Sequence, residues 1–200
     1  MNERPIHVVK LGGSLLDLPD LPQRLHTYFM ALNEHRLVLL IGGGSAADVV
    51  RQFDALHNLG DEAGHWLAVR AMQLNAHLTA NVLRGSQLVS DGEECDAAWQ
   101  AERLPVVDPL AWLERDEAQG HAVPHRWSFT SDSIAAHLAA RLAASHLTLL
   151  KSASPRLSCD VREAARLELV DADLPAASCG IAHIELVNLR AVPPAFHTLK

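Results

Sequence analysis

The chain has 200 residues, of which 48% are hydrophobic and 20% are charged, a composition typical of folded globular proteins and not of disordered or fibrous ones. Its 17 basic and 24 acidic side chains give a net charge of -7, which argues against a nucleic-acid binder, because phosphate backbones are held by clustered Lys and Arg. The chain has no secretory pattern at its start and no apolar run of about 18 residues, so we expect a single cytoplasmic domain over residues 1–200 that binds no membrane.

The N-terminal quarter predicts the same unit twice, a buried strand followed by a glycine turn and a helix. Residues 6–11 are apolar and β-branched, as in a strand that is buried on both faces of a parallel sheet. The apolar spacing over residues 21–33 predicts an amphipathic helix. Residues 37–41 then predict a second buried strand, followed by three glycines and by a helix that begins at Ser45 or Ala46.

The middle of the chain predicts two further helices and a strand. Residues 61–83 predict a long helix that is ended by the glycine of "RGSQL". "LPVVDPLAWL" predicts a short strand that enters a turn at Asp108 and Pro109. In "WSFTSDSIAAHLAARLAAS", Thr130 or Ser131 can cap a helix whose apolar residues recur at helical spacing.

The last third predicts a strand over residues 146–151, a helix over 161–167 and a final strand in "IAHIELVNL". The tail from Pro193 onward has little predicted structure. Because strands alternate with helices along the chain, we expect an α/β fold, a three-layer α/β/α sandwich with a mostly parallel central sheet.

The cysteines and histidines predict no metal site. Cys95, Cys159 and Cys179 are widely spaced and form no CxxC pair, so we interpret them as reduced thiols. The 12 histidines are scattered, and the closest pair, His121 and His125, flanks a proline in a segment unsuited to a ligand-presenting helix turn. Surface or hydrogen-bonded histidines are favoured over a metal cluster.

The two glycine loops are candidates for phosphate binding. In an open parallel sheet, ligands bind beyond the carboxyl ends of the strands, where helix N-termini offer unpaired N–H groups and partial positive charge. Glycines let a phosphate oxygen approach the backbone, although either loop alone could simply turn the chain. Together the two loops favour a phosphate cradle made by Gly12, Gly13, Gly42, Gly43 and Gly44.

Neither loop matches a standard nucleotide motif. The Walker pattern GxxxxGK followed by Ser or Thr is absent, and so is the dinucleotide fingerprint GxGxxG with its later acidic residue. Lys10 instead precedes the first glycine pair, at the end of a predicted strand. Its ammonium group could reach phosphates held by the loops, or Lys10 could be a solvated strand-end lysine.

The ordered motifs "VVKLGGSLL", "LIGGGSAADVVR", "FTSDSIAAHLA" and "LTLLK" resemble the amino-acid kinase superfamily, which includes acetylglutamate, aspartate, uridylate and isopentenyl phosphate kinases. "GHWLAVRAMQLNAHL" and "HRWSFTSDSIAAHLAARL" are most similar to the branch with the aminomethylfuran phosphate kinases of methanofuran biosynthesis. The similarity spans most of residues 8–150. The resemblance implies the amino-acid kinase fold, with ATP and Mg²⁺ as cofactors.

The resemblance also implies roles for single residues. Lys10 would hold the transferring phosphoryl group, and Asp132 would orient lysine side chains and water around magnesium. The alternative interpretation of Asp132 is a first-turn carboxylate favoured by the helix dipole. Lys151 would supply a second cation, or is a plain strand-end charge. ATP phosphates would lie against Gly12, Gly13, Ser14 and Ser131, and the acceptor would lie beside Gly42, Gly43 and Gly44.

Three further residues match the acceptor side of this branch. His65 and Arg70 lie on the predicted helix that lines the acceptor, and Arg51 follows the second glycine loop. Arginine suits bidentate recognition of phosphate, although a surface arginine is an equal alternative at either position.

The chain departs from the family after Lys151. Family kinases usually continue with an Asp-Val-Asp-Gly-like turn, whereas this chain reads "KSASPRLSCD". The portion over residues 151–200 is shortened, so we expect other contacts to hold the adenine.

The leading hypothesis is a small-molecule kinase that transfers the γ-phosphoryl of ATP to a phosphate or carboxylate acceptor, such as an aminomethylfuran phosphate or an analogue in one-carbon cofactor synthesis. The alternative is a non-catalytic family member that acts as a ligand-binding or partner subunit. A dinucleotide-dependent oxidoreductase would need the fingerprint that both loops lack. Because the family commonly forms dimers or rings, we expect a homo-oligomer.

Overall fold

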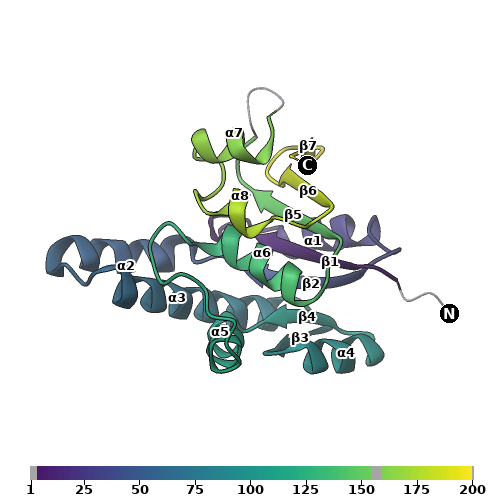
Figure 1. The fold of residues 1–200 in the computed structure, drawn as a ribbon. Coiled ribbons are helices and arrows are strands. Elements are labelled where there is room, and N and C mark those ends of the chain that lie inside the picture. The colour runs from purple at the N-terminus through teal and green to yellow at the C-terminus, as the bar shows by residue number, and fades with distance from the viewer. Residues whose placement is uncertain (1–3, 155–158, 200) are drawn as a thin grey trace.

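The strands form one sheet in which all neighbours run parallel except at one edge (Figure 1). The structure is a computed structural model that describes residues 4–154 and 159–199. The strand order within these residues is β3-β4-β2-β1-β5-β6-β7, with β7 antiparallel to β6. The strands are β1 (Ile6–Leu11), β2 (Arg36–Ile41), β3 (Ser86–Val89), β4 (Leu104–Val107), β5 (His146–Lys151), β6 (His183–Asn188) and β7 (Ala195–Thr198).

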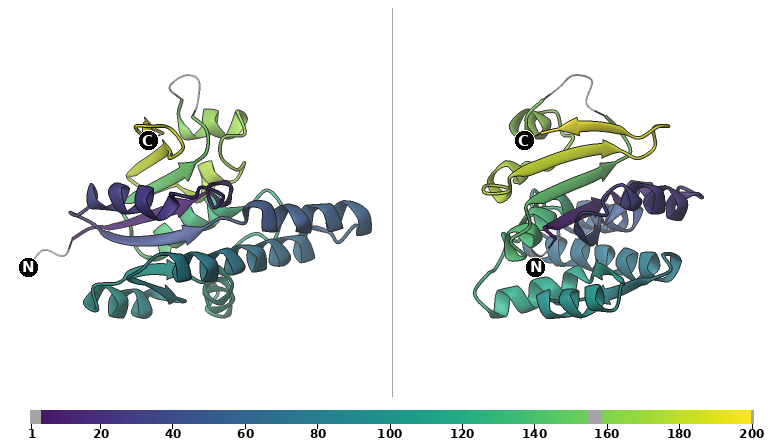
Figure 2. Two further views of the ribbon diagram at one scale, coloured as in Figure 1. Left: turned by 180° about the vertical axis from the view of Figure 1, so that it is seen from behind. Right: turned by 90° about the vertical axis from the view of Figure 1, so that its right-hand side faces the viewer.

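Helices cover both faces of the sheet. They are α1 (Leu21–Met30), α2 (Gly44–His57), α3 (Asp61–Val82), α4 (Gly92–Gln100), α5 (Pro109–Ala118), α6 (Ser131–Arg141), α7 (Val161–Arg166) and α8 (Leu174–Ala177). A 3-10 turn, Gly13–Leu15, follows β1. α1 lies on one face and α6 on the other, which confirms the predicted three-layer sandwich (Figure 2). None of the helices in the described ranges combines the length and apolarity needed to cross a membrane.

Two apolar cores flank the sheet because side chains alternate along each strand. Val8 of β1 and Leu149 of β5 belong to the core on the α6 side. Val9 and Leu150 belong to the core on the α1 side. The central strands are therefore buried on both faces, and this accounts for their nearly continuous apolar runs.

The sequence analysis misses five α-helices and strands: β3, α4, α5, α8 and β7. β3 has four residues, of which only Val89 is buried, so it lacks an apolar run. α4 and α5 are capped by Asp91 and Asp108, whose carboxylates accept hydrogen bonds from first-turn N–H groups. The turn predicted at Asp108 and Pro109 is therefore a helix start. β7 is a short edge strand in the tail for which little structure is predicted.

Candidate active site

The two glycine loops contact each other at the carboxyl ends of β1 and β2. A Cβ at Gly13 would overlap the backbone nitrogen of Gly44 and would lie 2.7 Å from the carbonyl oxygen of Gly42. Gly44 has a φ of +50°, which disfavours a side chain there as well. The backbone N–H of Gly12 donates to the carbonyl of Leu150, 2.8 Å away. These glycines are therefore needed for the contact between the loops, besides any approach of a ligand.

A buried asparagine holds the second loop. Nδ2 of Asn75, on α3, lies 2.8 Å from both the Gly42 and the Gly43 carbonyl oxygens and donates to them. The sequence analysis misses this residue. The available signal was an asparagine among the apolar residues Met72 and Ala76 of the predicted helix, since a buried amide is normally hydrogen-bonded.

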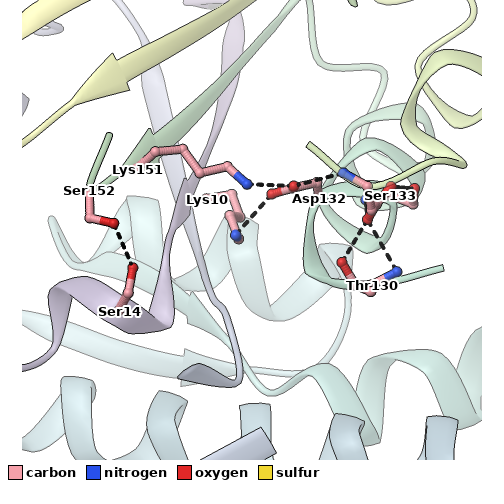
Figure 3. A network of polar contacts seen from close by, with 8 residues as sticks. Lys10, Ser14, Thr130, Asp132, Ser133, Lys151 and Ser152 are labelled. Carbon is pink, nitrogen blue, oxygen red and sulfur yellow. Dashed lines mark hydrogen bonds and ion pairs between the residues drawn. The ribbon is translucent and has the colours of Figure 1, made fainter. Parts of the chain in front are cut away.

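Asp132 joins two lysines at the centre of the site (Figure 3). Nζ of Lys10 lies 2.9 Å from Oδ1 of Asp132, and Nζ of Lys151 lies 2.6 Å from Oδ2. Lys10 and Asp132 are buried, and Lys151 is mostly covered. The structure thus brings together the three residues predicted as catalytic, which come from β1, α6 and β5.

Strand alternation explains why both lysines meet α6. Lys10 lies two residues after Val8 on β1, and Lys151 lies two residues after Leu149 on β5, so each lysine points to the same face of the sheet as that residue. Val8 and Leu149 face the α6 core, so both lysines point to that side. β1 and β5 are parallel neighbours, which places the two ammonium groups at the same sheet edge.

Burial and the neighbouring charges shift the pKa values of Asp132 and Lys10. Burial by itself raises the pKa of the Asp132 carboxyl, but the charges of Lys10 and Lys151 outweigh burial and bring this pKa well below its usual range. Burial lowers the pKa of Lys10, and the Asp132 carboxylate opposes this shift without cancelling it. We therefore treat Asp132 as ionised at neutral pH, with its charge holding both ammonium groups.

The N-terminus of α6 is capped from a distant part of the chain. Thr130 is the N-cap residue, one of the two predicted positions, but its side chain makes no capping hydrogen bond. Instead the carboxylate of Asp171 accepts hydrogen bonds from the backbone N–H groups of Thr130 and Ser133, at 3.1 and 2.9 Å. Sequence analysis misses Asp171 because it lies 41 residues from Thr130.

A cavity of about 290 Å³ opens above these groups. Lys10, Lys151 and the glycine loops line one end of it. Of the predicted residues, those that line it are Lys10, Gly12, Gly13, Ser14, Gly43, Gly44, Arg51, His65, Ser131 and Lys151. Gly42 lies just beneath, where a Cβ would be 3.1 Å from the Ser131 hydroxyl. Arg70 does not line the cavity; it is exposed and donates to the carbonyl of Trp66.

The far end of the cavity carries an indole and two guanidinium groups, each paired with a carboxylate, Arg51 with Asp48 and Arg126 with Asp173. Trp127 and Arg126 line it and are not predicted as site residues, although "HRW" precedes the Thr-Ser-Asp motif. The indole N–H of Trp127 donates to Asp54 at 2.8 Å, and the guanidinium of Arg51 lies 5.6 Å from the indole ring. A Cβ at Gly64 would lie 2.7 Å from this indole, so the glycine of "GHW" lets Trp127 pack on α3.

His65 is buried at this end of the cavity. Burial, and next the neighbouring His125, lower its pKa, so the ring is neutral at pH 7. Its Nε2 has no hydrogen-bond partner within the described part of the chain. A neutral imidazole with a free ring nitrogen is suited to hydrogen-bond a polar group of a ligand.

A larger hollow of about 1200 Å³ lies at the amino ends of the strands. Its charged side chains pair with one another, for example Arg115 with Asp91 and Arg141 with Asp116. Among the residues that the structure describes, no lysine and no glycine pair lines this hollow, in contrast to the smaller cavity. The smaller cavity at the opposite sheet edge is therefore the better candidate for chemistry on an anion.

Fold and site together define an α/β protein with a cationic, glycine-lined site at the carboxyl edge of its sheet. The chain belongs to the amino acid kinase family, whose model matches residues 5–177. This match confirms the family that the motifs predict.

Individual relatives agree with this assignment. A [5-(aminomethyl)furan-3-yl]methyl phosphate kinase of Methanocaldococcus jannaschii is 29% identical over 137 residues, which are 66% of this chain and 59% of the relative. The chain thus spans about three fifths of that protein. A UMP kinase from Ureaplasma parvum has a TM-score of 0.66 at 14% identity, covering 96% of this chain and 93% of its own. A uridylate kinase from Archaeoglobus fulgidus has a TM-score of 0.63 at 18% identity, covering 91% and 89%. These two share the fold.

Proposed function

We propose that this protein is an ATP-dependent kinase that transfers the γ-phosphoryl group to an anionic acceptor. The observation that carries this proposal is the cluster in which one buried carboxylate holds two ammonium groups beside two touching glycine loops. Both lysines line the cavity, whereas the carboxylate of Asp132 that pairs with them does not. Such fixed cations stabilise the charge that spreads over a transferring phosphoryl group.

The reaction needs positioning more than proton transfer. An oxygen of the ionised acceptor attacks the γ-phosphorus, the bond from this phosphorus to the β–γ bridging oxygen breaks, and ADP leaves with that electron pair. No general base is required, because the acceptor is already deprotonated at neutral pH. Lys10 and Lys151 would contact the transferring group, and Asp132 would fix both.

The residues fit ATP phosphates and a nucleotide-borne Mg²⁺. Gly12, Gly13 and Ser14 line the cavity, and the two glycines place no side chain between their backbone and a phosphate. Bound Mg²⁺ supplies charge neutralisation of the phosphate oxygens. The described residues offer no cluster of three acidic, His or Cys side chains that would cage a metal. Mg²⁺ is commonly held by substrate phosphates and water, which matches this site.

We further propose that the acceptor is a phosphate ester of a small planar ring. Arg51 and Arg126 line the far end of the cavity beside the indole of Trp127. Guanidinium groups suit a resident phosphate, which would compete here with the carboxylates of Asp48 and Asp173. An indole face suits an aromatic ring. The similarity to a kinase named for an aminomethylfuran phosphate supports the same acceptor class here.

A turnover assay coupled to calorimetry tests this proposal. We expect the protein to release ADP from Mg-ATP when the aminomethylfuran phosphate is present, and not without an acceptor. The panel should include UMP, acetylglutamate and aspartate. Tight ATP binding without turnover on any acceptor would support a non-catalytic, ligand-binding subunit instead. Release of ADP with every acceptor at equal rate would contradict the proposed acceptor class.

The protein is also proposed to act as a cytoplasmic homo-oligomer. Leu67, Leu74, Leu78 and Val82 are exposed and recur on one face of α3. A continuous apolar stripe on a long helix is typical of an interface, and a second copy presents the same stripe.

A further inference from the structure

Asp171 links the C-terminal part of the chain to the α6 N-terminus. Its Oδ2 accepts from the backbone N–H of Thr130, from the Thr130 hydroxyl at 2.8 Å and from the backbone N–H of Ser133. The Ser133 hydroxyl donates to the other carboxylate oxygen. One carboxylate therefore takes four donors from the first turn of the helix that carries Asp132.

The backbone of Asp171 also contacts Asp132 directly. Its N–H donates to Oδ2 of Asp132 at 3.2 Å, on the same oxygen that accepts from Lys151. Thus Asp132 has three partners, and one of them is supplied by the segment before α8.

The position of Asp171 is fixed on both sides. Val170 and Leu174 are buried, and both belong to the core that includes Leu138 of α6. The segment between them cannot move far without breaking this packing, because buried side chains interlock closely. The contacts of Asp171 are therefore held by the fold.

We propose that Asp171 is a positioning residue for phosphoryl transfer, which fixes the start of α6 and orients Asp132 so that both lysines reach the cavity. This inference rests on the proposed kinase function. Asp171 acts through Asp132 and has no place against the substrate itself; it does not line the cavity. Loss of its contacts would let the Asp132 carboxylate shift by a fraction of an ångström or more, which is enough to slow a reaction that depends on alignment.

Asp171 also bears on the charge of Lys10. The charged groups around the Lys10 ammonium are Asp132 on α6, Lys151 on β5 and Asp171. Burial lowers the pKa of Lys10 most, and the negative charge of Asp171 acts in the opposite direction. If this charge is removed, the pKa of Lys10 falls, so the ammonium loses its proton at a lower pH.

The test compares Asp171→Asn with Asp160→Asn, which removes a carboxylate cap from α7 away from the site. We expect Asp171→Asn to lower kcat about 10- to 100-fold, with a smaller change in the KM for ATP. The basic limb of its pH–rate profile should move to lower pH. Asp160→Asn should change neither quantity. Equal kinetics and equal pH profiles in the two variants would overturn the proposal.

A second measurement needs no turnover. The side-chain NMR signal of Lys10 can be followed against pH in the free wild-type protein and in Asp171→Asn. A lower midpoint in the variant supports the proposal, and an unchanged midpoint contradicts it. If the wild-type protein phosphorylates none of the acceptors, the proposed function fails, and this titration still decides whether Asp171 controls the Lys10 cluster.

Discussion

Lys10 and Lys151 converge on one carboxylate although 141 positions separate them in the chain, since β1 and β5 are adjacent and parallel. Asp132 thereby sets the direction of two cations at once. A group that holds two cations is more sensitive to substitution than either of them, because both lysines lose their partner together. The proposed role of each of these three residues therefore depends on the orientation of its side chain and on its charge.

Replacing Lys10 by Met keeps most of its apolar stem and removes its charge. We expect kcat/KM to fall by about 100- to 1000-fold, the range seen when one preorganised donor to a developing charge is removed. Arg84→Met, which removes an exposed cation after α3, is the matched control and should leave the rate unchanged. Steady-state kinetics measures kcat/KM for both variants, and circular dichroism checks that both are folded. A Lys10→Met enzyme of normal rate would remove Lys10 from the mechanism.

The sequence could predict part of this site and not the rest. Lys10, Asp132 and Lys151 each lie in a local motif, and strand parity alone places both lysines on one face. Asn75 and Asp171 act on segments far away in the chain, so no local pattern reveals their partners. Residues of this kind become visible only when the tertiary contacts are known.

Among the contacts between elements, the one between the two glycine loops leaves the least room for a side chain. Gly13→Ala would drive a Cβ into the backbone of the second loop, whereas Gly92→Ala meets only one side-chain atom at 3.7 Å. We expect Gly13→Ala to lower the free energy of unfolding by about 1 to 3 kcal/mol, as overpacking does, and to reduce turnover. Gly92→Ala should do neither. Thermal unfolding measures the difference, and equal melting temperatures would show that the loops do not touch in solution.

The amino edge of the sheet carries a histidine cluster, whose ring centroids lie 4.5 to 5.2 Å apart. Burial, and then its neighbours His35 and His146, lower the pKa of His7 to about 3. Because the folded pKa lies below the unfolded value of 6.5, this group stabilises the fold above pH 6.5, and the contribution declines as the pH falls toward 3. The cluster consists of His7, His35, His146 and His183.

The titration of His7 should lower the free energy of unfolding at pH 5 by about 2 kcal/mol relative to pH 7.5. His7→Gln can keep a hydrogen bond to Thr148, which now lies 2.8 Å from Nε2 of His7, and it has no charge to gain. Urea unfolding at both pH values should therefore show a smaller pH dependence for His7→Gln than for the wild type. An identical pH dependence would mean that His7 is not buried as described.

Long and strongly periodic elements are predictable from this sequence, and short ones are not. β1, β2 and β5 carry continuous apolar runs, and α3 has 22 residues. β3 and β7 have four residues each and few buried side chains, so their pairing depends on neighbours that a local pattern does not contain. The loop quoted as "KSASPRLSCD" includes residues 155–158, which lie outside the described residues, and the missing acidic turn there stays a prediction.

At the scale of the whole molecule, the apolar stripe on α3 predicts self-association. Replacing Leu74 and Leu78 together by Glu should convert an oligomer to a monomer, since charges in an apolar interface are costly to desolvate. Leu167→Glu, at an exposed position after α7, is the control and should not change the mass. Sedimentation velocity measures the assembly. A wild-type protein that stays monomeric at tens of micromolar would contradict this prediction.

The fold gathers the residues proposed to bind phosphate at one sheet edge, where β1, β2 and β5 end and α2 and α6 begin. This arrangement agrees with the general rule that open α/β sheets bind ligands beyond their strand ends. The residues proposed to bind the acceptor, Arg51, His65 and Trp127, lie on α2, on α3 and in the segment before α6. The acceptor and the donor would thus meet over the Lys10, Asp132 and Lys151 cluster.

The most direct test of this account is a phosphorus NMR spectrum of the protein with Mg-ATP and the aminomethylfuran phosphate. We predict that the γ-phosphate signal of ATP disappears, that ADP appears, and that the acceptor phosphate becomes a diphosphate with two coupled signals. Lys10→Met should leave the starting spectrum unchanged over the same time. A spectrum of the wild-type protein that shows only ATP, or ADP with free phosphate and an unmodified acceptor, would contradict the central claim.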